Sequence, residues 1–355
     1  MTLESEAASI RKERAALGLE GLVHGLEFVI LNTQPQLQRA AVAELLRTTG
    51  LACRQGYVDG NFTDYVLGAA GSADLVVRSR KGGVNPFAEF NKGPKTALLP
   101  DTRLETLVFL TDDLKKYVSI QKARGIKFLT PDLIENDKYL FIQTPPSAYT
   151  GNSTGFVQWK SGKRDYSHAG AENLPELPAK PELPYLAKIG CLDHIATRVT
   201  AGHRDKAMLE FMSLTCYNFE LAVYIQELNS ITNVTRVSEK DFALVFTSGI
   251  EPFKDENFSG PTEKFVHLYG ARAHHLAFNT EDIENTCAAL ARDGLEYLLG
   301  LVGSEKEGLK QTFTVPSRNT LLVNEYIYRY GDFDGFFTRS NVLALTRASG
   351  NIPAD

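Results

Sequence analysis

Two stretches in different halves of this chain share one pattern of residue types. The segment LVFLTDDLKKYVSIQKARGIKFL (107–129) can be laid without a gap on LAFNTEDIENTCAALARDGLEYL (276–298). Each has an apolar run typical of a strand, a threonine followed by acids, an amphipathic run typical of a helix, and a second short apolar run. Such self-similarity indicates a duplicated structural unit, and it restricts the fold more than any other feature of the sequence.

The ends of the two predicted helices also correspond. Thr111 and Thr280 stand just before the acids, where we expect them to act as N-caps, and the acids suit the positive end of the helix dipole. Gly125 and Gly294 stand where the helices should end, because glycine readily takes the conformation that stops a helix. We expect a short strand after each glycine.

Each half of the chain also contains an earlier unit of the same kind. The stretches LVHGLEFVIL (22–31) and CLDHIATRV (191–199) are strand-like, and a helix-like run follows each of them. The simplest architecture is an α+β fold of four βαβββ modules, paired into two half-open barrels. The concave face of each barrel could hold a ligand.

A proline-rich segment separates the two halves. Residues 167–190 carry four prolines and no sustained periodicity, which favours an extended connection. The predicted organisation is an N-terminal arm that is a short solvated helix or a loose segment (1–20), a first domain without a catalytic site (21–160), a linker (161–188), a second, catalytic domain (189–335), and a C-terminal helix and tail (336–355).

The composition is that of an enzyme-sized soluble protein. Its 355 residues are 43% hydrophobic and 23% charged, and the net charge of −5 argues against a nucleic-acid partner, because phosphate binding needs a basic surface. No apolar stretch is long enough to cross a membrane, and the N-terminus lacks the apolar run of a signal peptide, so we expect a cytoplasmic protein without a membrane partner. The cysteines follow neither a zinc-binding nor a disulfide spacing and are expected to be small buried residues; they are Cys53, Cys191, Cys216 and Cys287.

Three residues of the second half form a candidate metal site. His194 and His275 lie in predicted strands, and Glu325 stands in the apolar and aromatic run TLLVNEYIYRY, where a carboxylate is costly unless it is paired or bound to a cation. In the repeat, Thr106 takes the place of His275, and the first-half segment GFVQWKSG, which corresponds to the glutamate strand, has no acid. A histidine needed only for the fold would have less reason to appear in one copy alone. His194 has a less clear counterpart, because His24 lies within one residue of the equivalent place.

The type of ligand limits the metal. Two imidazoles and one carboxylate on one face of an octahedron leave three positions open, which suits Fe(II) enzymes that bind a chelating substrate and dioxygen. Zinc would more often take cysteine or a third histidine, whereas manganese or nickel would also accept this set. His274 is expected beside the site or at the surface, because successive side chains of a strand point to opposite faces.

The same segments resemble the three ligand segments of 4-hydroxyphenylpyruvate dioxygenase, within the vicinal oxygen chelate superfamily. They are LDHIATRV, GARAHHLAFNTEDI and QTFTVPSRNTLLVNEYIYR, and a weaker similarity extends over nearly the whole chain. The resemblance implies Fe(II) held by His194, His275 and Glu325. It further implies that dioxygen oxidatively decarboxylates a 2-oxo acid and that the same substrate molecule is hydroxylated.

The resemblance also implies a substrate pocket. A Gln-x-Phe before the glutamate strand and a C-terminal gating helix in GFFTRSNVLALTRAS (335–349) would supply its residues, and Tyr328 is a further candidate to pack an apolar substrate group. The expected pocket residues are Gln311, Phe313, Phe337, Asn341 and Tyr328.

The chain departs from the family pattern near this pocket. Only 50 residues separate His275 from Glu325, because LLGLVGSEKEGLK replaces a longer helical excursion, and Val342 stands where a pocket phenylalanine is expected. The implied substrate is 4-hydroxyphenylpyruvate, converted to homogentisate in tyrosine catabolism, or a related aryl or alkyl 2-oxo acid, and a homo-oligomer is compatible with the sequence. Three alternatives stay open: benzylic hydroxylation as in a 4-hydroxymandelate synthase, extradiol ring cleavage, and a metal-free binding protein on the same scaffold.

Overall fold

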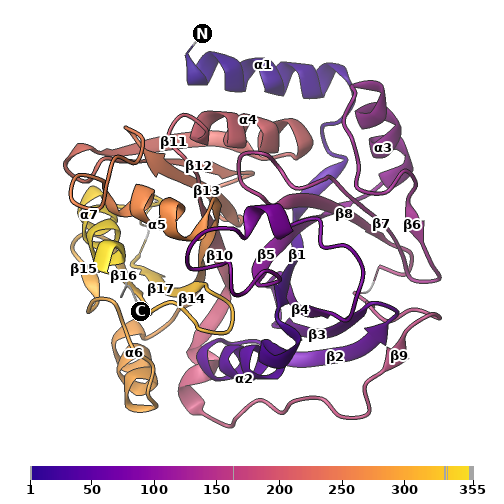
Figure 1. Ribbon diagram of the computed structural model, residues 1–355. Coiled ribbons are helices and arrows are strands. Elements are labelled where there is room, and N and C mark those ends of the chain that lie inside the picture. The colour runs from indigo at the N-terminus through magenta and orange to yellow at the C-terminus, as the bar shows by residue number, and fades with distance from the viewer. Residues whose placement is uncertain (1, 163, 332, 334, 352–355) are drawn as a thin grey trace.

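The computed structural model describes residues 2–162, 164–331, 333 and 335–351, which form two mixed β-sheets, each curled around a concave face (Figure 1). We call them the first half-barrel (β1 to β9) and the second half-barrel (β10 to β17). The strands of the first are β1 (Val23–Thr33), β2 (Ala52–Asp59), β3 (Phe62–Gly68), β4 (Asp74–Arg80), β5 (Arg103–Thr111), β6 (Ile134–Glu135), β7 (Tyr139–Gln143), β8 (Ser153–Trp159) and β9 (Glu172–Asn173). The strands of the second are β10 (Ile189–Arg198), β11 (Asn218–Ile225), β12 (Ser230–Arg236), β13 (Ala243–Gly249), β14 (Arg272–Thr280), β15 (Val302–Ser304), β16 (Leu309–Phe313) and β17 (Val323–Arg329).

The helices lie between and around these strands. They are α1 (Leu3–Ala16), α2 (Gln38–Thr48), α3 (Leu114–Ala123), α4 (Arg204–Leu214), α5 (Pro261–Tyr269), α6 (Ile283–Arg292) and α7 (Arg339–Ala348). Four of them, α2, α3, α4 and α6, each follow the first strand of a βαβββ module. The predicted α+β fold of four such modules in two half-barrels is therefore confirmed.

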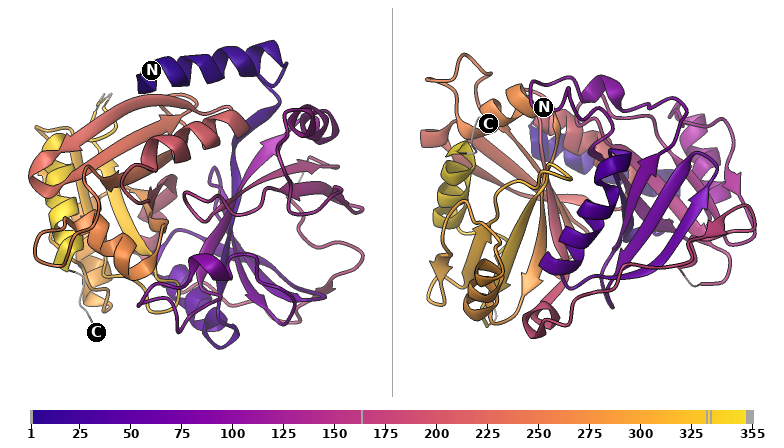
Figure 2. Two further views of the ribbon diagram at one scale, coloured as in Figure 1. Left: turned by 45° about the horizontal axis from the view of Figure 1, so that its top comes forward. Right: turned by 60° about the horizontal axis from the view of Figure 1, so that its bottom comes forward.

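The two half-barrels have the same strand order. The first runs β9-β2-β3-β4-β1-β5-β8-β7-β6, and the second runs β11-β12-β13-β10-β14-β17-β16-β15, so β1, β5 and β8 correspond to β10, β14 and β17. Figure 2 shows the two sheets as two lobes side by side. The duplication seen in the sequence is thus a duplication of whole sheets.

The register of the strands corrects one predicted equivalence. His194 pairs with Ala277 across β10 and β14, and Phe28 pairs with Val108 across β1 and β5. Because Val108 corresponds to Ala277 in the repeat, the counterpart of His194 is Phe28, and the prediction that His24 lies within one residue of the equivalent place was wrong. The chain from His194 to Ala277 is three residues longer than the chain from Phe28 to Val108. Counting back from the repeat without this insertion therefore places His24 near His194.

The predicted helix starts were also wrong. Thr111 and Thr280 are the last residues of β5 and β14, where they still pair with neighbouring strands. The helices begin later, after Asp113 and Asp282. The Asp113 side chain accepts a hydrogen bond from the backbone N–H of Lys116, the third residue of α3, at 2.9 Å. Strand pairing therefore outweighed the capping preference of threonine.

The predicted helix ends are confirmed, but the strands expected after them are not. Gly125 and Gly294 follow α3 and α6 with φ of +82° and +92°, the left-handed region that glycine favours. The residues directly after these glycines, 126–129 and 295–298, form no named strand. In the second half-barrel a single bridge joins Tyr297 to Thr314.

The N-terminal arm is a docked helix rather than a loose segment. Nη1 of the buried Arg14 in α1 donates to the carbonyls of Met212, Thr215 and Tyr217 at the end of α4, at 2.7 to 3.0 Å (Figure 1). These carbonyls lack partners within α4, so the cation satisfies and neutralises the end of that helix.

The predicted linker is more than an extended connection. Its β9 pairs with β2, and the buried Tyr166 donates its hydroxyl hydrogen to Asp74 Oδ2 at 3.0 Å. The first part of the segment therefore completes the first half-barrel. Where one domain ends and the next begins remains a proposal.

Two corresponding arginines tie the half-barrels together. Arg103 begins β5 and Arg272 begins β14, and both are buried. Arg103 Nη2 donates to the Ala271 carbonyl, and Arg272 Nη2 donates to the Thr102 carbonyl at 2.7 Å. One apolar core also contains residues of both halves, so the two sheets form a single packed body.

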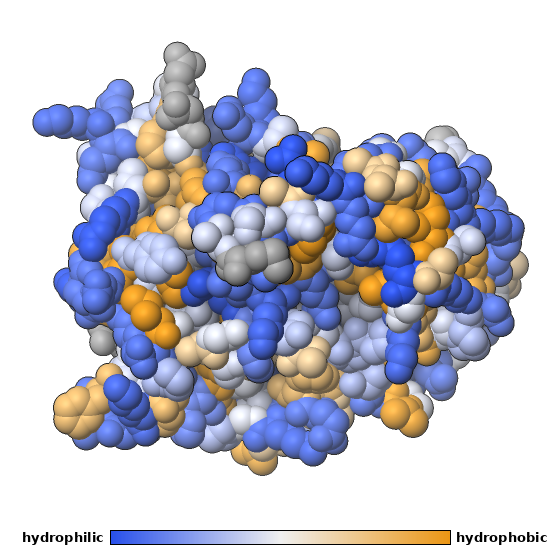
Figure 3. All heavy atoms as spheres, turned by 90° about the horizontal axis from the view of Figure 1, so that it is seen from above, coloured by the Kyte–Doolittle hydropathy of each residue, from blue (hydrophilic) through white to orange (hydrophobic). Residues whose placement is uncertain are grey.

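One face of the molecular surface is mainly polar. Seen from above, hydrophilic side chains predominate, with hydrophobic patches between them (Figure 3). Among the helices of the described chain, none has the length and apolar character needed to cross a bilayer.

Candidate metal centre

The three predicted ligands come together on the concave face of the second half-barrel. They lie on three adjacent strands, His194 on β10, His275 on β14 and Glu325 on β17. Glu325 Oε2 is 3.2 Å from Nε2 of each histidine, and the two Nε2 atoms are 3.3 Å apart. All three are buried, with exposed fractions of 0%, 8% and 1%.

This triangle has the dimensions of one face of a metal coordination shell. With bonds of about 2.1 Å, adjacent ligands lie about 3.0 Å apart in an octahedron and about 3.4 Å apart in a tetrahedron. The observed sides of 3.2 to 3.3 Å fall between these values. Three buried donors at this spacing therefore fit a divalent cation, and a carboxylate facing two imidazoles in a buried place is otherwise costly.

His194 is oriented by the residue before it. Its Nδ1–H donates to Asp193 Oδ1 at 2.7 Å, which leaves Nε2 free to bind a cation. Arg329 donates to both oxygens of Asp193, at 2.6 and 3.1 Å. Burial alone would raise the pKa of Asp193, but the hydrogen bond from His194 and the Arg329 charge hold it below its usual range. For the cationic form of His194 burial has the opposite sign and lowers the pKa. The carboxylates of Glu325 and Asp193 outweigh this effect and raise the pKa of His194 to about 9.

His275 is oriented by its neighbour. Its Nδ1 lies 2.8 Å from Nδ1 of His274, which is buried and not at the surface. When His275 Nε2 binds a cation, its Nδ1–H donates to His274, and the proton of His274 then sits on Nε2. Burial, with the nearby positive charges of His194 and Arg198, holds the pKa of His275 well below its usual range.

Glu325 is oriented through a chain of amides that reaches α7. Gln311 Nε2 donates to Glu325 Oε1, which leaves Oε2 facing the two histidines. Asn341 of α7 donates to Gln311 Oε1 at 2.9 Å and so fixes which way the Gln311 amide points. The helix that covers the site is thereby linked to one of the metal ligands.

A small cavity of about 50 Å³ lies beside the triad, under α7. His275 and Glu325 line it together with Phe313, Phe337 and Val342. The Phe313 ring lies 4.8 Å from the His275 ring, and the Phe337 ring lies 5.3 Å from the His194 ring. Two of the five predicted pocket residues therefore reach the cavity.

The other three predicted pocket residues do not line this cavity. Gln311 and Asn341 are buried behind Glu325, where they act on the ligand. Tyr328 lies three positions from Glu325 on β17 and so points to the opposite face of the strand, where it packs against the main core. The prediction for Tyr328 ignored this alternation and is corrected.

Sequence reasoning missed several residues of the site. Arg198, Thr232 and Thr247 line the far end of the cavity, and Phe336 packs its ring 5.3 Å from the His194 ring. Arg198 could have been found, because it stands four residues after His194 in one strand and must share its face. The pairing of Asp193 with Arg329 joins distant segments and left no local signal.

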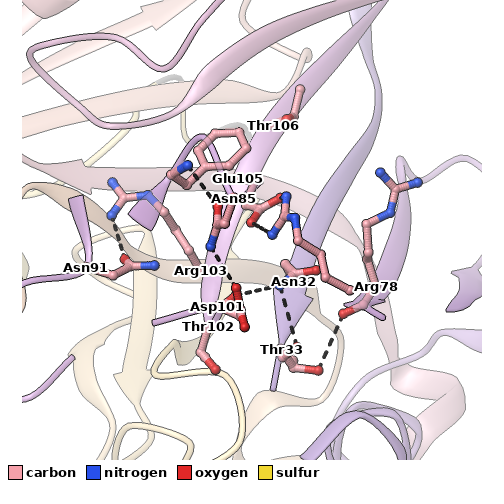
Figure 4. Close-up of polar contacts among 12 residues, drawn as sticks. Asn32, Thr33, Arg78, Asn85, Asn91, Asp101, Thr102, Arg103, Glu105 and Thr106 are labelled. Atoms are coloured by element: carbon pink, nitrogen blue, oxygen red, sulfur yellow. Dashed lines mark hydrogen bonds and ion pairs between the residues drawn. The ribbon is translucent and has the colours of Figure 1, made fainter. Parts of the chain in front are cut away.

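The first half-barrel has different residues at the equivalent positions. Phe28, Thr106 and Gly155 replace His194, His275 and Glu325, as the strand registers show. Figure 4 shows Thr106 on β5 and the polar contacts nearby, where Glu105 stands in the place of His274. The cavity of this half-barrel is larger, about 320 Å³, and is lined mainly by aromatic side chains, including Tyr139.

The chain has a vicinal oxygen chelate fold, and its second half-barrel carries a candidate two-histidine, one-carboxylate metal site. No protein-family model and no curated protein sequence matches this chain. Among solved structures, a triple mutant of 4-hydroxymandelate synthase from Streptomyces coelicolor is similar, with a TM-score of 0.67 and 16% identity over 92% of this chain and 98% of the synthase.

A second similar structure is a fusion protein of a xylose isomerase-like TIM barrel and 4-hydroxyphenylpyruvate dioxygenase. It has a TM-score of 0.64 and 14% identity over 96% of this chain, which spans 56% of the fusion protein. Both similarities confirm the fold that the sequence resemblance implied.

Proposed function

We propose that this protein is an Fe(II)-dependent dioxygenase that oxidatively decarboxylates a 2-oxo acid and hydroxylates the same molecule. One observation carries the proposal: two buried imidazole Nε2 atoms and one buried carboxylate oxygen form a triangle with sides of 3.2 to 3.3 Å. This ligand set leaves positions open for a chelating substrate and dioxygen. The names of the two similar structures support the same class of reaction.

The residues of the chain hold and shield the proposed ion. His194, His275 and Glu325 would bind it, while Asp193 and Gln311 keep the donor atoms of His194 and Glu325 pointing inward. A bound ferrous ion would supply the electron chemistry needed to activate dioxygen against a chelated 2-oxo acid.

The apolar side chains around the site exclude water. Phe313, Phe337, Val342 and Leu345 line the cavity and surround the triad on the side of α7. A dry site strengthens the interaction between the ligands and a charged substrate, and it limits side reactions. The proposed catalytic strategy is therefore a fixed metal geometry in an enclosed, water-poor cavity.

The wider proposal includes the substrate and the setting. The sequence resemblance suggests 4-hydroxyphenylpyruvate, giving homogentisate or a mandelate, or a related aryl or alkyl 2-oxo acid. Tyrosine catabolism is proposed on the same basis. A cytoplasmic location is proposed from the charged N-terminal segment and the scattered cysteines, and a homo-oligomer is compatible with the sequence.

Anaerobic loading with Fe(II), followed by a panel of 2-oxo acids, tests the function. We expect a visible charge-transfer band when a 2-oxo acid chelates the ion, and uptake of dioxygen with release of carbon dioxide once air is admitted. Oxygen uptake with catechols and no carbon dioxide would instead indicate extradiol cleavage. Absence of iron binding would indicate a metal-free binding protein.

A further inference from the structure

We infer that Arg198 binds a second carboxylate of the substrate, at the end away from the metal. The substrate class would then be a short 2-oxo acid with an acidic tail. This inference rests on the proposed function and narrows its substrate. It is carried by an unpaired buried cation that faces the same cavity as the metal ligands.

The guanidinium of Arg198 is buried and incompletely bonded. Its residue is 5% exposed, and Nη2 donates to Ser349 Oγ at 2.7 Å. The guanidinium carbon lies 4.9 Å from the centre of the Phe265 ring. Nη1 is shielded from solvent and has no hydrogen-bond partner among the described residues. Leaving a charged N–H group buried without a partner is costly, and a bound anion would remove that cost.

No carboxylate of the described chain forms an ion pair with this arginine. The carboxylate of Glu263 influences Arg198 electrostatically but lies beyond ion-pair distance. Its Oε2 accepts from Asn229 Nδ2 at 2.9 Å and from the backbone N–H of Gly260 at 3.1 Å, and its buried Oε1 has no partner among the described residues. Buried guanidinium groups can be satisfied by carbonyls, as Arg103 is, but Nη1 of Arg198 has no acceptor of either kind among the described residues. Because Arg198 lines the cavity, we expect the missing acceptor to come with a ligand.

The position of Arg198 suits the far end of a substrate held at the metal. His194, Ala196 and Arg198 are alternate residues of β10 and share its concave face, and Ala196 pairs with His275. Arg198 is thus one step of about 7 Å beyond the level of His275 along the sheet. Its partner on β13, Thr247, and the next residue across, Thr232, add two hydroxyls to this end of the cavity.

The first half-barrel offers an internal control. At the same level of its sheet, Arg78 replaces Thr247 and Asp64 replaces Thr232, as the pairings of β1, β4 and β3 show. There Arg78 is bonded to both oxygens of Asp64, at 2.7 and 2.9 Å (the Arg78 side chain appears in Figure 4). That half-barrel supplies its own carboxylate for the partly buried Arg78, whereas the second half-barrel has hydroxyls where the acid would stand.

The size of the cavity favours a short molecule. Its volume of about 50 Å³ has room for a few water molecules, whereas pockets for larger ligands usually exceed about 300 Å³. An aryl pyruvate would require Phe337 or α7 to move, and a short-chain diacid would require less. Arg272 also has unpartnered N–H groups, but it does not line the cavity and carries no such inference.

Anaerobic calorimetry with the Fe(II)-loaded protein tests the inference with a matched pair of ligands. 2-Oxopentanedioate and 2-oxopentanoate have equal chain length and differ in the distal carboxylate. We expect the diacid to bind about 10- to 100-fold more tightly, as a charged hydrogen bond in a buried site predicts. Arg198→Gln should remove this preference and leave the Kd of the monoacid unchanged, and Arg198→Lys should keep part of it.

Two controls separate this role from a structural one. Arg204→Gln removes a cation of α4 that is bonded to Asp205 outside the cavity, and it should preserve the preference. Each variant must also retain Fe(II), because a variant without metal would lose both ligands alike.

Several results would overturn the inference while the proposed function stands. One is equal binding of diacid and monoacid by the unaltered protein, or tighter binding of 4-hydroxyphenylpyruvate than of the diacid. Another is an equal loss for both ligands in Arg198→Gln, which would place Arg198 at the carboxylate that chelates the metal. If no 2-oxo acid gives a charge-transfer band, the proposed function fails instead. Pentanedioate, which lacks the keto group, then decides whether Arg198 is an anion site: binding that Arg198→Gln abolishes supports it, and absence of binding overturns it.

Discussion

The two half-barrels share one topology but treat their concave faces in opposite ways. In the first, two buried carboxylates are each paired with a partly buried arginine: Asp64 with Arg78, and Glu105 with Arg80. In the second, three metal-type ligands face one another and Arg198 forms no ion pair among the described residues. Because an unpaired buried charge is costly, the second concave face is the one that we propose to bind ligands.

Backbone spacing adds to the difference in side chains. Gly155 occupies the place of Glu325, and a Cβ atom there would lie 3.0 Å from the Cγ2 atoms of Thr106 and Val108. This contact is closer than ordinary packing allows. The first half-barrel therefore lacks both the acid and the room for it.

The largest expected effect concerns the triad itself. His275→Ala should reduce bound Fe(II) to a small fraction of one ion per chain and lower turnover by about a thousandfold or more, because the chemistry depends on the ion. Metal analysis and oxygen uptake measure both. Thr106→Ala changes the equivalent residue of the first half-barrel and should alter neither. Iron retained by His275→Ala would show that the site lies elsewhere.

The next prediction compares the effects of Arg78 and Arg198 on stability. Arg78→Met leaves the buried Asp64 without its ion-pair partner and should lower the free energy of unfolding by about 3–5 kcal/mol. Arg198→Met breaks no ion pair among the described residues, so the free energy of unfolding should change by less than about 1 kcal/mol, or increase. Urea unfolding of both variants, without added ligand, measures the difference. A large loss for Arg198→Met would mean that the chain itself satisfies this cation.

A smaller effect is expected from the residue that orients His194. Asp193→Asn should weaken binding of a divalent cation by about 10- to 100-fold, because the carboxylate fixes the ring and increases its basicity. Glu27 occupies the corresponding position of the first half-barrel, where it accepts hydrogen bonds from Arg164 and Trp159. Glu27→Gln is therefore the matched control, and competition titrations should show no change for it. Equal losses in both variants would indicate a general effect on folding.

The features that could be predicted from the sequence are those that depend on residues close together in the chain. The repeat and the strand patterns were enough to predict four modules, because these depend on local periodicity. The proximity of His194, His275 and Glu325 was predicted from the asymmetry of the repeat, from one acid in an apolar strand and from the resemblance of the three segments to a known family. The equivalence of His194 with Phe28 was missed, since it depends on the register of strands about eighty residues apart.

The pocket was harder to predict for a similar reason. The alternation of side chains along one strand was enough to predict that Arg198 faces the cavity and that Tyr328 does not. The Asp193–Arg329 pair and the link from Asn341 through Gln311 to Glu325 depend on how β10, β17, β16 and α7 pack. No local pattern encodes such contacts.

The last prediction concerns the dependence of metal binding on pH. It applies only to the second half-barrel, because the first has Phe28, which cannot bind a proton, in the place of His194. The pKa of His194 is raised to about 9, so the metal-free protein carries an imidazolium at neutral pH that must lose its proton before a cation binds. Metal affinity should therefore rise by up to about tenfold per pH unit from pH 6.5 towards 9 and then level off. Calorimetry in buffers of different ionisation enthalpy should detect about one proton released at pH 7.

Stability of the metal-free protein should show the opposite slope in this window. A histidine whose pKa is raised in the folded state stabilises the fold fully below its unfolded value near 6.5, and this contribution is lost as pH rises through about 9. His275, whose pKa is lowered, acts only below pH 6.5, where its protonation in the unfolded chain reduces stability. Between pH 6.5 and 9 the metal-free protein should thus become less stable while its affinity for the cation grows. Slopes of the same sign would mean that His194 does not gain a proton on folding between pH 6.5 and 9, against the raised pKa of this residue.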